Sequence, residues 1–151
     1  MQGEYKMKRL RILPIILVVS LVSILILGAI PATLNACPID IKPGSYPNSI
    51  NLNSNGVVPV AVIGSADFSV EWIKPETVKF INAFAFKWSL ENVNGDIYMD
   101  MVFHFKTQEI GLTSNSFEGS LTIGDTIWGA GSGFTTPPDT INIVPIVPKK
   151  K

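Results

Sequence analysis

Two apolar runs of alternating character, separated by a short polar segment, constrain this chain more than any other feature. The alternating apolar positions are Phe84, Phe86, Trp88 and Leu90 in the first run and Ile97, Met99, Met101, Phe103 and Phe105 in the second. A period of two is typical of half-buried β-strands. Asn94-Gly95 lies between the runs, and this dipeptide favours a type I′ hairpin turn because both residues tolerate a positive φ. The pattern predicts a long hairpin whose apolar face, Trp88 included, belongs to the core of a small β domain.

After residue 36, the chain consists of short apolar runs punctuated by Gly, Pro, Asn and Ser. Strands are predicted over residues 39–41, 50–52, 57–63, 68–72, 78–81, 120–123, 126–128 and 140–144, with a turn or one helical turn over 73–77. Pro59 cannot donate a ladder hydrogen bond, so strand 57–63 should lie at a sheet edge or contain a bulge. Many short strands without helical periodicity predict an all-β fold: a single antiparallel β-sandwich, Ig-like, over residues 37–145, followed by a basic tail at 146–151.

The first 36 residues have a different character from the rest. Residues 1–11 are basic, whereas residues 12–32 contain no charged side chain. An uncharged run of this length is longer than a usual signal-peptide core and close to what a helix needs to span a bilayer. The positive flank precedes the run, which favours a cytoplasmic N-terminus and an exported remainder. Residues 1–36 are therefore predicted to be a signal peptide or a signal-anchor transmembrane segment, with one hydrophobic helix formed by the apolar residues 12–32. The domain would face outside at the cell membrane or be secreted.

Cys37 is the only cysteine, so the chain has no intramolecular disulfide. Leu34-Asn35-Ala36-Cys37 resembles a lipoprotein signal-peptidase box, in which a small residue precedes a cysteine that becomes lipidated. Asn35 departs from the small or apolar residue usual in such a box. Cys37 is therefore a candidate lipidation site, and the alternatives are a retained anchor or ordinary cleavage after Ala36.

The charge distribution argues against a nucleic-acid partner. The whole chain has 12 basic and 12 acidic residues, and the first 36 contain four of the basic ones against one acid. The remainder therefore holds 8 basic and 11 acidic groups, and an acidic surface repels phosphate backbones. The sequence predicts no nucleic-acid partner. It favours contact with the membrane through the N-terminal segment and with a cell-surface protein or polysaccharide through the domain.

Five sequence blocks follow one another in an order that resembles a known group of proteins. They are IDIKPGSYPNSINL (39–52), GVVPVAVIGSADF (56–68), IKPETVKF (73–80), ENVNGDIYMDMVFHFKTQEIGL (91–112) and DTINIV (139–144). This pattern resembles a family of exported β-rich surface modules of archaea and bacteria, which occur alone or appended to larger surface proteins. The resemblance covers nearly all of residues 38–145. It implies export and a β-rich fold, and it implies no activity because none is established for the family.

The polar segment of the hairpin is a candidate metal loop. Asn92, Asn94, Asp96 and Asp100 place side-chain oxygens at loop positions one, three, five and nine, and the Tyr98 carbonyl stands at position seven. Hard cations such as Ca²⁺ select oxygen ligands at this spacing. The segment resembles the calcium loops of dockerins and of integrin-type propeller repeats.

The loop also departs from those calcium loops. They commonly have Asp at the first position and Gly after the fifth, where this chain has Asn92 and Ile97. Position twelve, a bidentate Glu in EF-hand loops, is Phe103 here. The alternative interpretation is a plain hairpin turn with polar residues.

The remaining candidate residues favour structural roles. His104 is the only histidine and is predicted to lie on the sheet surface, pairing across strands. Gly129–Gly133 has no βαβ context and is predicted to be a flexible connection. Trp72, Trp88, Trp128, Tyr46 and Tyr98 could stack on sugars where exposed, and Trp128 beside the glycines is the best ligand candidate among them.

The sequence thus favours a non-catalytic, membrane-tethered or secreted surface module with a structural or interaction role, stabilised by Ca²⁺ in the 92–100 loop. The first alternative is a carbohydrate-binding module that uses exposed aromatic rings. A further alternative is a small extracellular hydrolase built on Asp96 and Asp100. Adjacent acids on one loop are better explained by a metal than by a catalytic pair, so we expect no enzyme.

Overall fold

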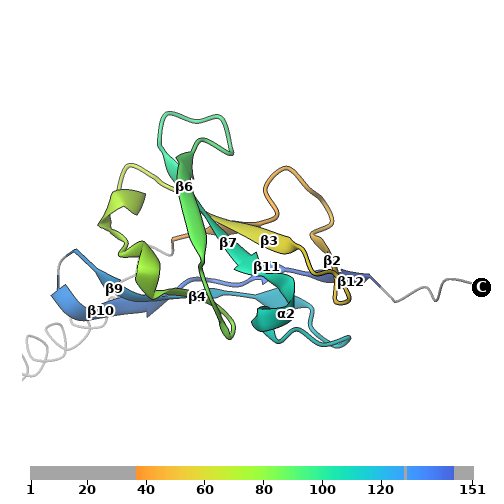
Figure 1. Cartoon of the computed structure of the whole chain (residues 1–151). Helices are drawn as coiled ribbons and strands as arrows, with labels where there is room; N and C mark the ends of the chain where they lie inside the picture. The colour runs from red at the N-terminus through yellow and green to blue at the C-terminus, as the bar shows by residue number, and fades with distance from the viewer. Residues whose placement is uncertain (1–36, 128, 145–151) are drawn as a thin grey trace, which may run out of the picture. The chain divides into compact units, whose positions relative to one another are not determined.

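Twelve short strands account for most of the secondary structure of the computed structural model, which describes residues 37–127 and 129–144 (Figure 1). Helix is limited to η1 (Val70–Trp72), η2 (Pro75–Thr77) and α2 (Thr107–Ile110) in this part of the chain. The all-β fold expected from the sequence is therefore confirmed. No helix in the described ranges is long and apolar enough to cross a bilayer. The predicted signal or anchor segment, Trp128 and the basic tail lie outside the described residues.

Two four-stranded antiparallel sheets carry the core. The first has the order β1 (Ile39–Ile41), β3 (Val57–Val62), β7 (Asp100–Lys106), β6 (Lys87–Glu91). The second has the order β10 (Gly129–Thr135), β9 (Leu121–Thr126), β4 (Val78–Phe80), β5 (Ala83–Phe84). Two small pairs complete the fold: β11 (Asp139–Thr140) with β8 (Glu118–Gly119), antiparallel, and β12 (Asn142–Val144) with β2 (Ser49–Asn51), parallel.

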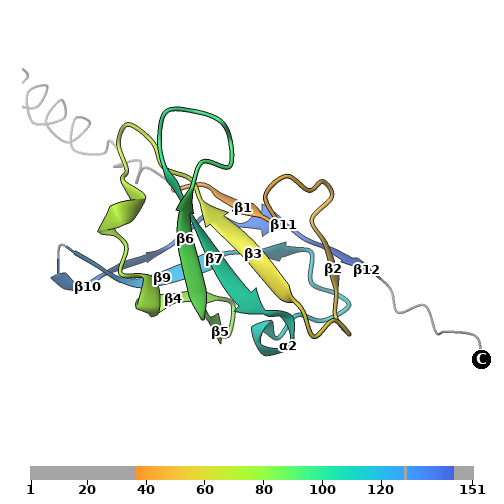
Figure 2. The same cartoon turned by 45° about the horizontal axis from the view of Figure 1, so that its top comes forward.

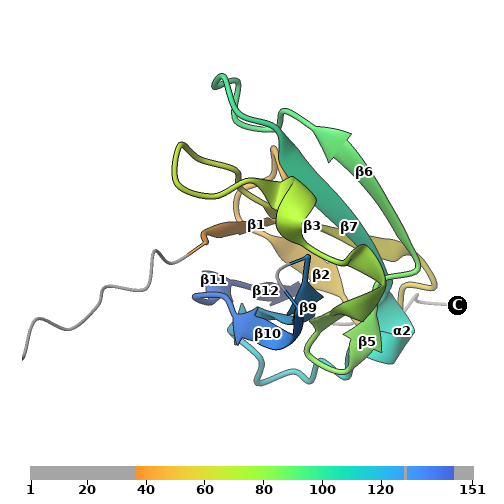
Figure 3. The same ribbon diagram turned by 90° about the vertical axis from the view of Figure 1, so that its left-hand side faces the viewer.

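The inward faces of the two sheets share one hydrophobic core. Val60, Phe103 and Phe105 from the first sheet are fully buried, as is Phe80 from the second. The rings of Phe80 and Phe105 lie 5.5 Å apart between their centroids, so the sheets are in direct contact. Figure 3 shows β3, β7 and β6 on one side of this core and β9 and β10 on the other. The core residues all lie between Cys37 and Ile143, so the unit Asn35–Lys151 contains a complete core of its own.

Strand β3 is central in its sheet, contrary to the edge position predicted from Pro59. The order of the sheet places β3 between β1 and β7. Backbone groups of Pro59 face β1, because the Pro59 carbonyl accepts a hydrogen bond from Lys42 N at 2.8 Å. Strand β1 ends at Ile41, and Lys42 has a positive φ of 58° that turns the chain away. The missing N–H therefore falls beyond the last paired residue of β1, where it disrupts no ladder.

The hairpin exists, but its turn differs from the prediction and only its second strand contributes to the core as predicted. Strands β6 and β7 are joined by the long loop 92–99 that projects beyond the sheet (Figure 2), so no two-residue type I′ turn forms. Trp88, predicted to be core, is 41% exposed, although its cross-strand partner Phe103 is fully buried. Strand β6 is the edge of its sheet, and β5, the edge strand of the other sheet, has only two residues. The side chains of Trp88 and Leu90 on β6 therefore point toward the inward face of the sheet, but no strand of the second sheet covers them there.

Two further sequence predictions were wrong. Residues 68–72 form a single bridge followed by η1 instead of a strand, because Trp72 N donates to Ser69 O in an i to i+3 bond. The glycine-rich segment predicted to be a flexible connection belongs to β10, paired with β9. A Cβ at Gly133 would collide with the backbone oxygens of Ile123 and Gly124. The glycine thus permits close strand contact.

Candidate functional site

The loop 92–99 is built from successive turns in which polar side chains hold the backbone. Gly95 N donates to Asn92 Oδ1 at 2.7 Å, and Asp96 N donates to Asn94 Oδ1 at 3.0 Å. Tyr98 N donates to Asp96 Oδ1 at 2.7 Å. Asn and Asp favour such turns because their short side chains reach backbone groups two or three residues on. The three predicted ligands at positions one, three and five are therefore turn-forming residues on the same loop.

These side chains also converge on Asp96. Asn92 Nδ2 donates to the Asp96 carbonyl at 2.5 Å, and Asn94 Nδ2 donates to Asp96 Oδ2 at 2.8 Å. All three residues are exposed to solvent. Amide and carboxylate oxygens with water access are the donors that Ca²⁺ takes. Here each of these side-chain oxygens accepts a hydrogen bond within the loop, so an ion would have to replace those bonds. The set contains a single solvent-exposed carboxylate, which favours weak binding.

Asp100 does not share this exposed environment. Its side chain is fully buried, and each carboxylate oxygen accepts one backbone N–H at 2.9 Å, Oδ1 from Gly64 and Oδ2 from Val93. Asp100 therefore fastens the base of the loop to the chain that follows β3. No three His, Cys, Asp or Glu side chains gather to hold a metal in residues 37–127 and 129–144. Asp96 is exposed on the loop, whereas Asp100 is buried at the start of β7 with both oxygens bonded to backbone N–H groups, so the two carboxylates do not share one environment as a hydrolase pair does.

A second site was missed by the sequence reasoning. Asp40 on β1 and Asp139 on β11 line an open depression of about 450 Å³, together with Tyr46, Asn48 and Thr140. Burial, and secondarily the charge of Asp139, raises the pKa of Asp40. Tyr46 is 93% exposed beside this depression. The two aspartates lie in the first and last of the five sequence blocks. Their presence in these blocks was the one feature of the sequence that could have pointed to this site.

Only one of these two carboxylates is free to act on a ligand. Asp139 Oδ2 accepts hydrogen bonds from Ile41 N at 2.8 Å and from Asn48 Nδ2 at 2.9 Å, and Oδ1 accepts from Thr140 N at 2.7 Å. Asp139 therefore joins the C-terminal strands to β1. The carboxylate of Asp40 accepts no hydrogen bond from the described residues. The depression thus presents one carboxylate and one aromatic ring, an arrangement suited to binding a polar molecule.

The other candidate residues are scattered. His104 lies between Pro59 and Lys87 in the sheet, and its Nδ1 is buried without a hydrogen-bond partner in the described ranges. Trp72 packs edge-on against Phe68, with ring centroids 5.8 Å apart. Trp128, the best ligand candidate from the sequence, lies outside the described residues, so the sugar platform stays a prediction.

Cys37, the candidate lipidation site, is a member of the core. The side chain is 3% exposed, and its thiol donates to Ile63 O at 3.7 Å. Burial raises the pKa of this thiol to about 12. A lipid attached to the sulfur could not occupy this position, so a lipidated chain would have to release Cys37 from the core.

We expect the unmodified Cys37 thiol to react slowly. Only the thiolate is nucleophilic, so raising the pKa from an ordinary value of about 8.5 lowers the reactive fraction at pH 8 by about three orders of magnitude. The rate of reaction with an aromatic disulfide reagent should be correspondingly low in the folded chain and ordinary in denaturant. A control is Ser114→Cys in a Cys37→Ser background, because Ser114 is exposed. Equal rates for the two folded thiols would contradict the burial of Cys37.

The comparisons with known proteins assign neither site. No family model matches the chain, no curated protein is significantly similar to it, and no solved structure matches its fold, so its own geometry carries the functional argument.

Proposed function

We propose that this chain is a non-catalytic surface module, tethered to the membrane by its N-terminal segment or secreted, that acts through protein contacts at the β6 edge. The observation that carries the proposal is a row of large apolar side chains left exposed at this edge. Their exposed fractions are 54% for Phe84, 48% for Phe86, 41% for Trp88, 45% for Leu90 and 49% for Met99. Several large apolar side chains left exposed near one sheet edge are typical of interaction sites. The resemblance to exported β-rich modules supports the outward location.

The proposal includes the finer architecture of the domain. Direct contact between the rings of Phe80 and Phe105 joins the two four-stranded sheets through a common core. This arrangement supports a single Ig-like β-sandwich. The uncharged run of residues 12–32 supports a hydrophobic helix that precedes it.

The interaction role is tested by photo-crosslinking in intact cells that express the full chain. A photoreactive amino acid replaces Leu90 at the edge in one variant and Gln108 in another, since both positions are exposed. We expect a discrete adduct from position 90, lost when Trp88→Asp is added, and no adduct from position 108. No adduct from either position, or the same adducts from both, would reject the interaction role.

We further propose that loop 92–100 holds Ca²⁺. Asn92, Asn94 and Asp96 would bind through their side-chain oxygens and Tyr98 through its carbonyl, while the buried Asp100 supports the loop from beneath. The exposure of these three oxygen-bearing side chains on one short loop supports this assignment. The ion would make a solvent-exposed loop rigid beside the contact edge.

Calcium should raise the thermal unfolding midpoint of the domain. A dissociation constant of about 10⁻⁴–10⁻³ M, as in extracellular modules, would stabilise the native state by about 1.5–3 kcal/mol in 10 mM Ca²⁺, or on the order of 10 °C. The comparison is between EDTA and CaCl₂, with MgCl₂ as the ionic control. Asp96→Ala should abolish the shift with little effect in EDTA, because Asp96 is exposed. A shift that survives Asp96→Ala would place the ion elsewhere.

A carbohydrate-binding role is the second candidate, and the depression beside Tyr46 favours it. An exposed aromatic ring next to a carboxylate and amide groups can stack on a sugar ring while the polar groups bind hydroxyls. Titration of Tyr46→Ala and the unchanged chain with a panel of polysaccharides would detect it. Binding that depends on Tyr46 would support this role over protein contact.

A further inference from the structure

Strand β6 has a free backbone edge whose outward-facing groups can be identified. Thr107 N donates to Gly56 O, so the odd-numbered residues at this end of β7 hydrogen-bond β3. Backbone groups alternate in direction along an antiparallel strand, so the even-numbered residues of β7 face β6. Their partners there are Lys87, Ser89 and Glu91. The N–H and C=O groups of the two residues between these three, Trp88 and Leu90, therefore point away from the sheet.

The side chains of β6 divide between two faces. Trp88 and Leu90 share the inward face with Phe103 and Met101, their cross-strand partners, yet both remain more than 40% exposed. Lys87 and Glu91 point to the opposite face from Trp88. Ser89 Oγ donates to Glu91 Oε1 at 2.6 Å, and neither Lys87 nor Glu91 forms an ion pair within the described part of the chain. The edge thus presents unpaired backbone groups, apolar side chains and two unpaired charges of opposite sign.

This arrangement is self-complementary. When two β6 strands pair antiparallel about a twofold axis at Ser89, Lys87 of each copy lies opposite Glu91 of the other. In the same register, Trp88 of each copy lies opposite Leu90 of the other, and both expose the backbone groups that the pairing requires. An isologous contact of this kind closes after two copies.

Only the register centred on Ser89 pairs the charged side chains with opposite charges and the apolar side chains with each other. The outward-facing backbone groups also permit registers centred on Trp88 or on Leu90. Those registers place both charged residues opposite neutral ones, so the ionic complementarity is lost. A lysine on an edge strand normally discourages pairing. Here the Glu91 carboxylate of the other copy converts Lys87 into an attractive contact.

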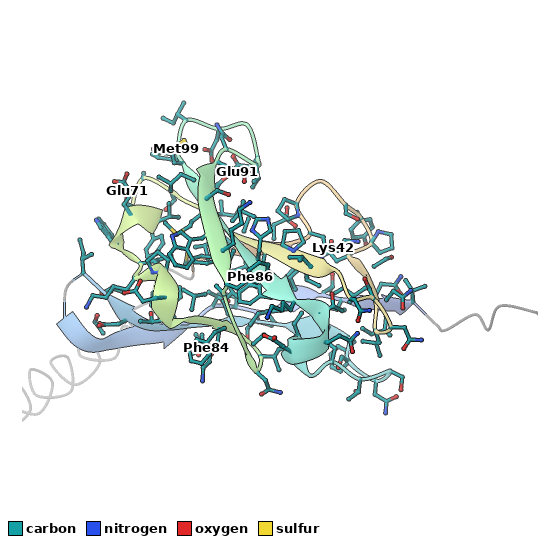
Figure 4. All side chains as sticks on the ribbon, viewed as in Figure 1. Lys42, Glu71, Phe84, Phe86, Glu91 and Met99 are labelled. Carbon is teal, nitrogen blue, oxygen red and sulfur yellow. The ribbon has the colours of Figure 1, made fainter. Side chains whose placement is uncertain are left out.

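Further exposed apolar residues lie beyond both ends of β6. Figure 4 shows Phe84 and Phe86 near one end of β6 and Glu91 and Met99 near the other. In an antiparallel pair, the end of β6 near Phe86 in one copy lies beside the end that leads into loop 92–99 in the other. Met99 and Ile97, 49% and 88% exposed, belong to that loop. Exposed apolar side chains therefore lie beyond each end of the paired strands.

We propose that the partner at this edge is a second copy of the chain, joined through antiparallel pairing of β6 with β6 about a twofold axis at Ser89. The inference rests on the proposed interaction role and specifies the partner. The pairing would join the first sheets of two domains into one continuous sheet.

Charge exchange tests the pairing in solution. Lys87→Glu and Glu91→Lys each place like charges opposite one another in a homodimer, whereas a mixture of the two variants restores both opposite pairs. Sedimentation velocity of the full chain in density-matched detergent should show self-association weakened about tenfold in each variant alone. The equimolar mixture should return to the behaviour of the unchanged chain. Mixtures no more associated than the single variants would overturn the proposal.

A cysteine at the axis tests the register in membranes. Ser89 faces Ser89 of the other copy in a non-hydrogen-bonded pair, where Cα atoms lie about 4.5 Å apart, within the range that a disulfide bridges. Ser89→Cys in the full chain should therefore give a covalent dimer under mild oxidation. The controls are the unchanged chain, whose Cys37 is buried, and Ser114→Cys at an exposed loop position. Dimer formation no greater than that of Ser114→Cys would also overturn the proposal.

The photo-crosslinking experiment separates this inference from the proposed function. An adduct at position 90 with the mass of two copies supports both. An adduct with a different protein, combined with failure of the Ser89→Cys dimer, would keep the interaction role and reject self-pairing. No adduct at all would reject the interaction role on which the inference rests.

Discussion

Asp100→Ala should lower the free energy of unfolding by about 3–5 kcal/mol, one of the two largest effects expected for a single substitution in this domain. The substitution removes a fully buried carboxylate and leaves the N–H groups of Gly64 and Val93 without acceptors. Each hydrogen bond to a charged acceptor contributes about 1.5–3 kcal/mol, and a buried donor left unsatisfied bears a desolvation penalty. Urea unfolding of the domain in EDTA measures the effect without any contribution from a metal.

Matched variants identify the cause of the loss. Asp100→Asn keeps one acceptor oxygen and should lie between Ala and the unchanged chain, at about 2 kcal/mol. Asp96→Ala removes an exposed carboxylate from the same loop and should cost less than about 1 kcal/mol. Equal effects of Asp96→Ala and Asp100→Ala would contradict the separate roles that we assign to them. The contrast also means that Asp96, and not Asp100, is the informative position for testing Ca²⁺.

Phe103→Ala should be comparably destabilising, by about 3–5 kcal/mol. The ring is fully buried between the sheets, and its removal forfeits transfer free energy and leaves a cavity that the close-packed strands cannot collapse. Thermal unfolding should show a decrease of the midpoint on the order of 20 °C.

Trp88→Ala is the matched control because Trp88 is the cross-strand partner of Phe103 on the same face. At 41% exposure, its truncation should cost about 2 kcal/mol, roughly half the loss for Phe103→Ala, measured at protein concentrations too low for self-association. A loss as large as that of Phe103→Ala would show that Trp88 belongs to the core, as its place in the sequence pattern suggests.

The pair Trp88 and Phe103 shows how far sequence patterning reaches. Alternation correctly assigns both residues to one face of a hairpin, because side-chain direction in a strand depends only on the local backbone. Whether that face is covered depends on which strand lies at the sheet edge and on how far the other sheet extends. Both are properties of the tertiary arrangement. The prediction was therefore right for Phe103 and wrong for Trp88.

The candidate sites show the same contrast between local features, which the sequence reveals, and contacts between distant segments, which it does not. The turn-forming residues Asn92, Asn94 and Asp96 are recognisable in the sequence because their hydrogen bonds span only a few residues. Asp100 looks equivalent to them in the sequence, yet its contact with Gly64 spans 36 residues and converts it into a buried support. The depression containing Asp40 and Asp139 could not be predicted, because two strands far apart in the chain bring those carboxylates together.

The sequence by itself determined that this protein is an all-β domain, where most of its strands lie and which residues shape its long polar loop, because those properties depend on short-range periodicity and turn chemistry. Only the tertiary structure decided that β3 is central and that β6 is a free edge. It also decided that Cys37 and Asp100 are buried and that an apolar, self-complementary strand faces solvent. Sheet order and layer coverage arise from contacts between distant segments, which no local pattern encodes.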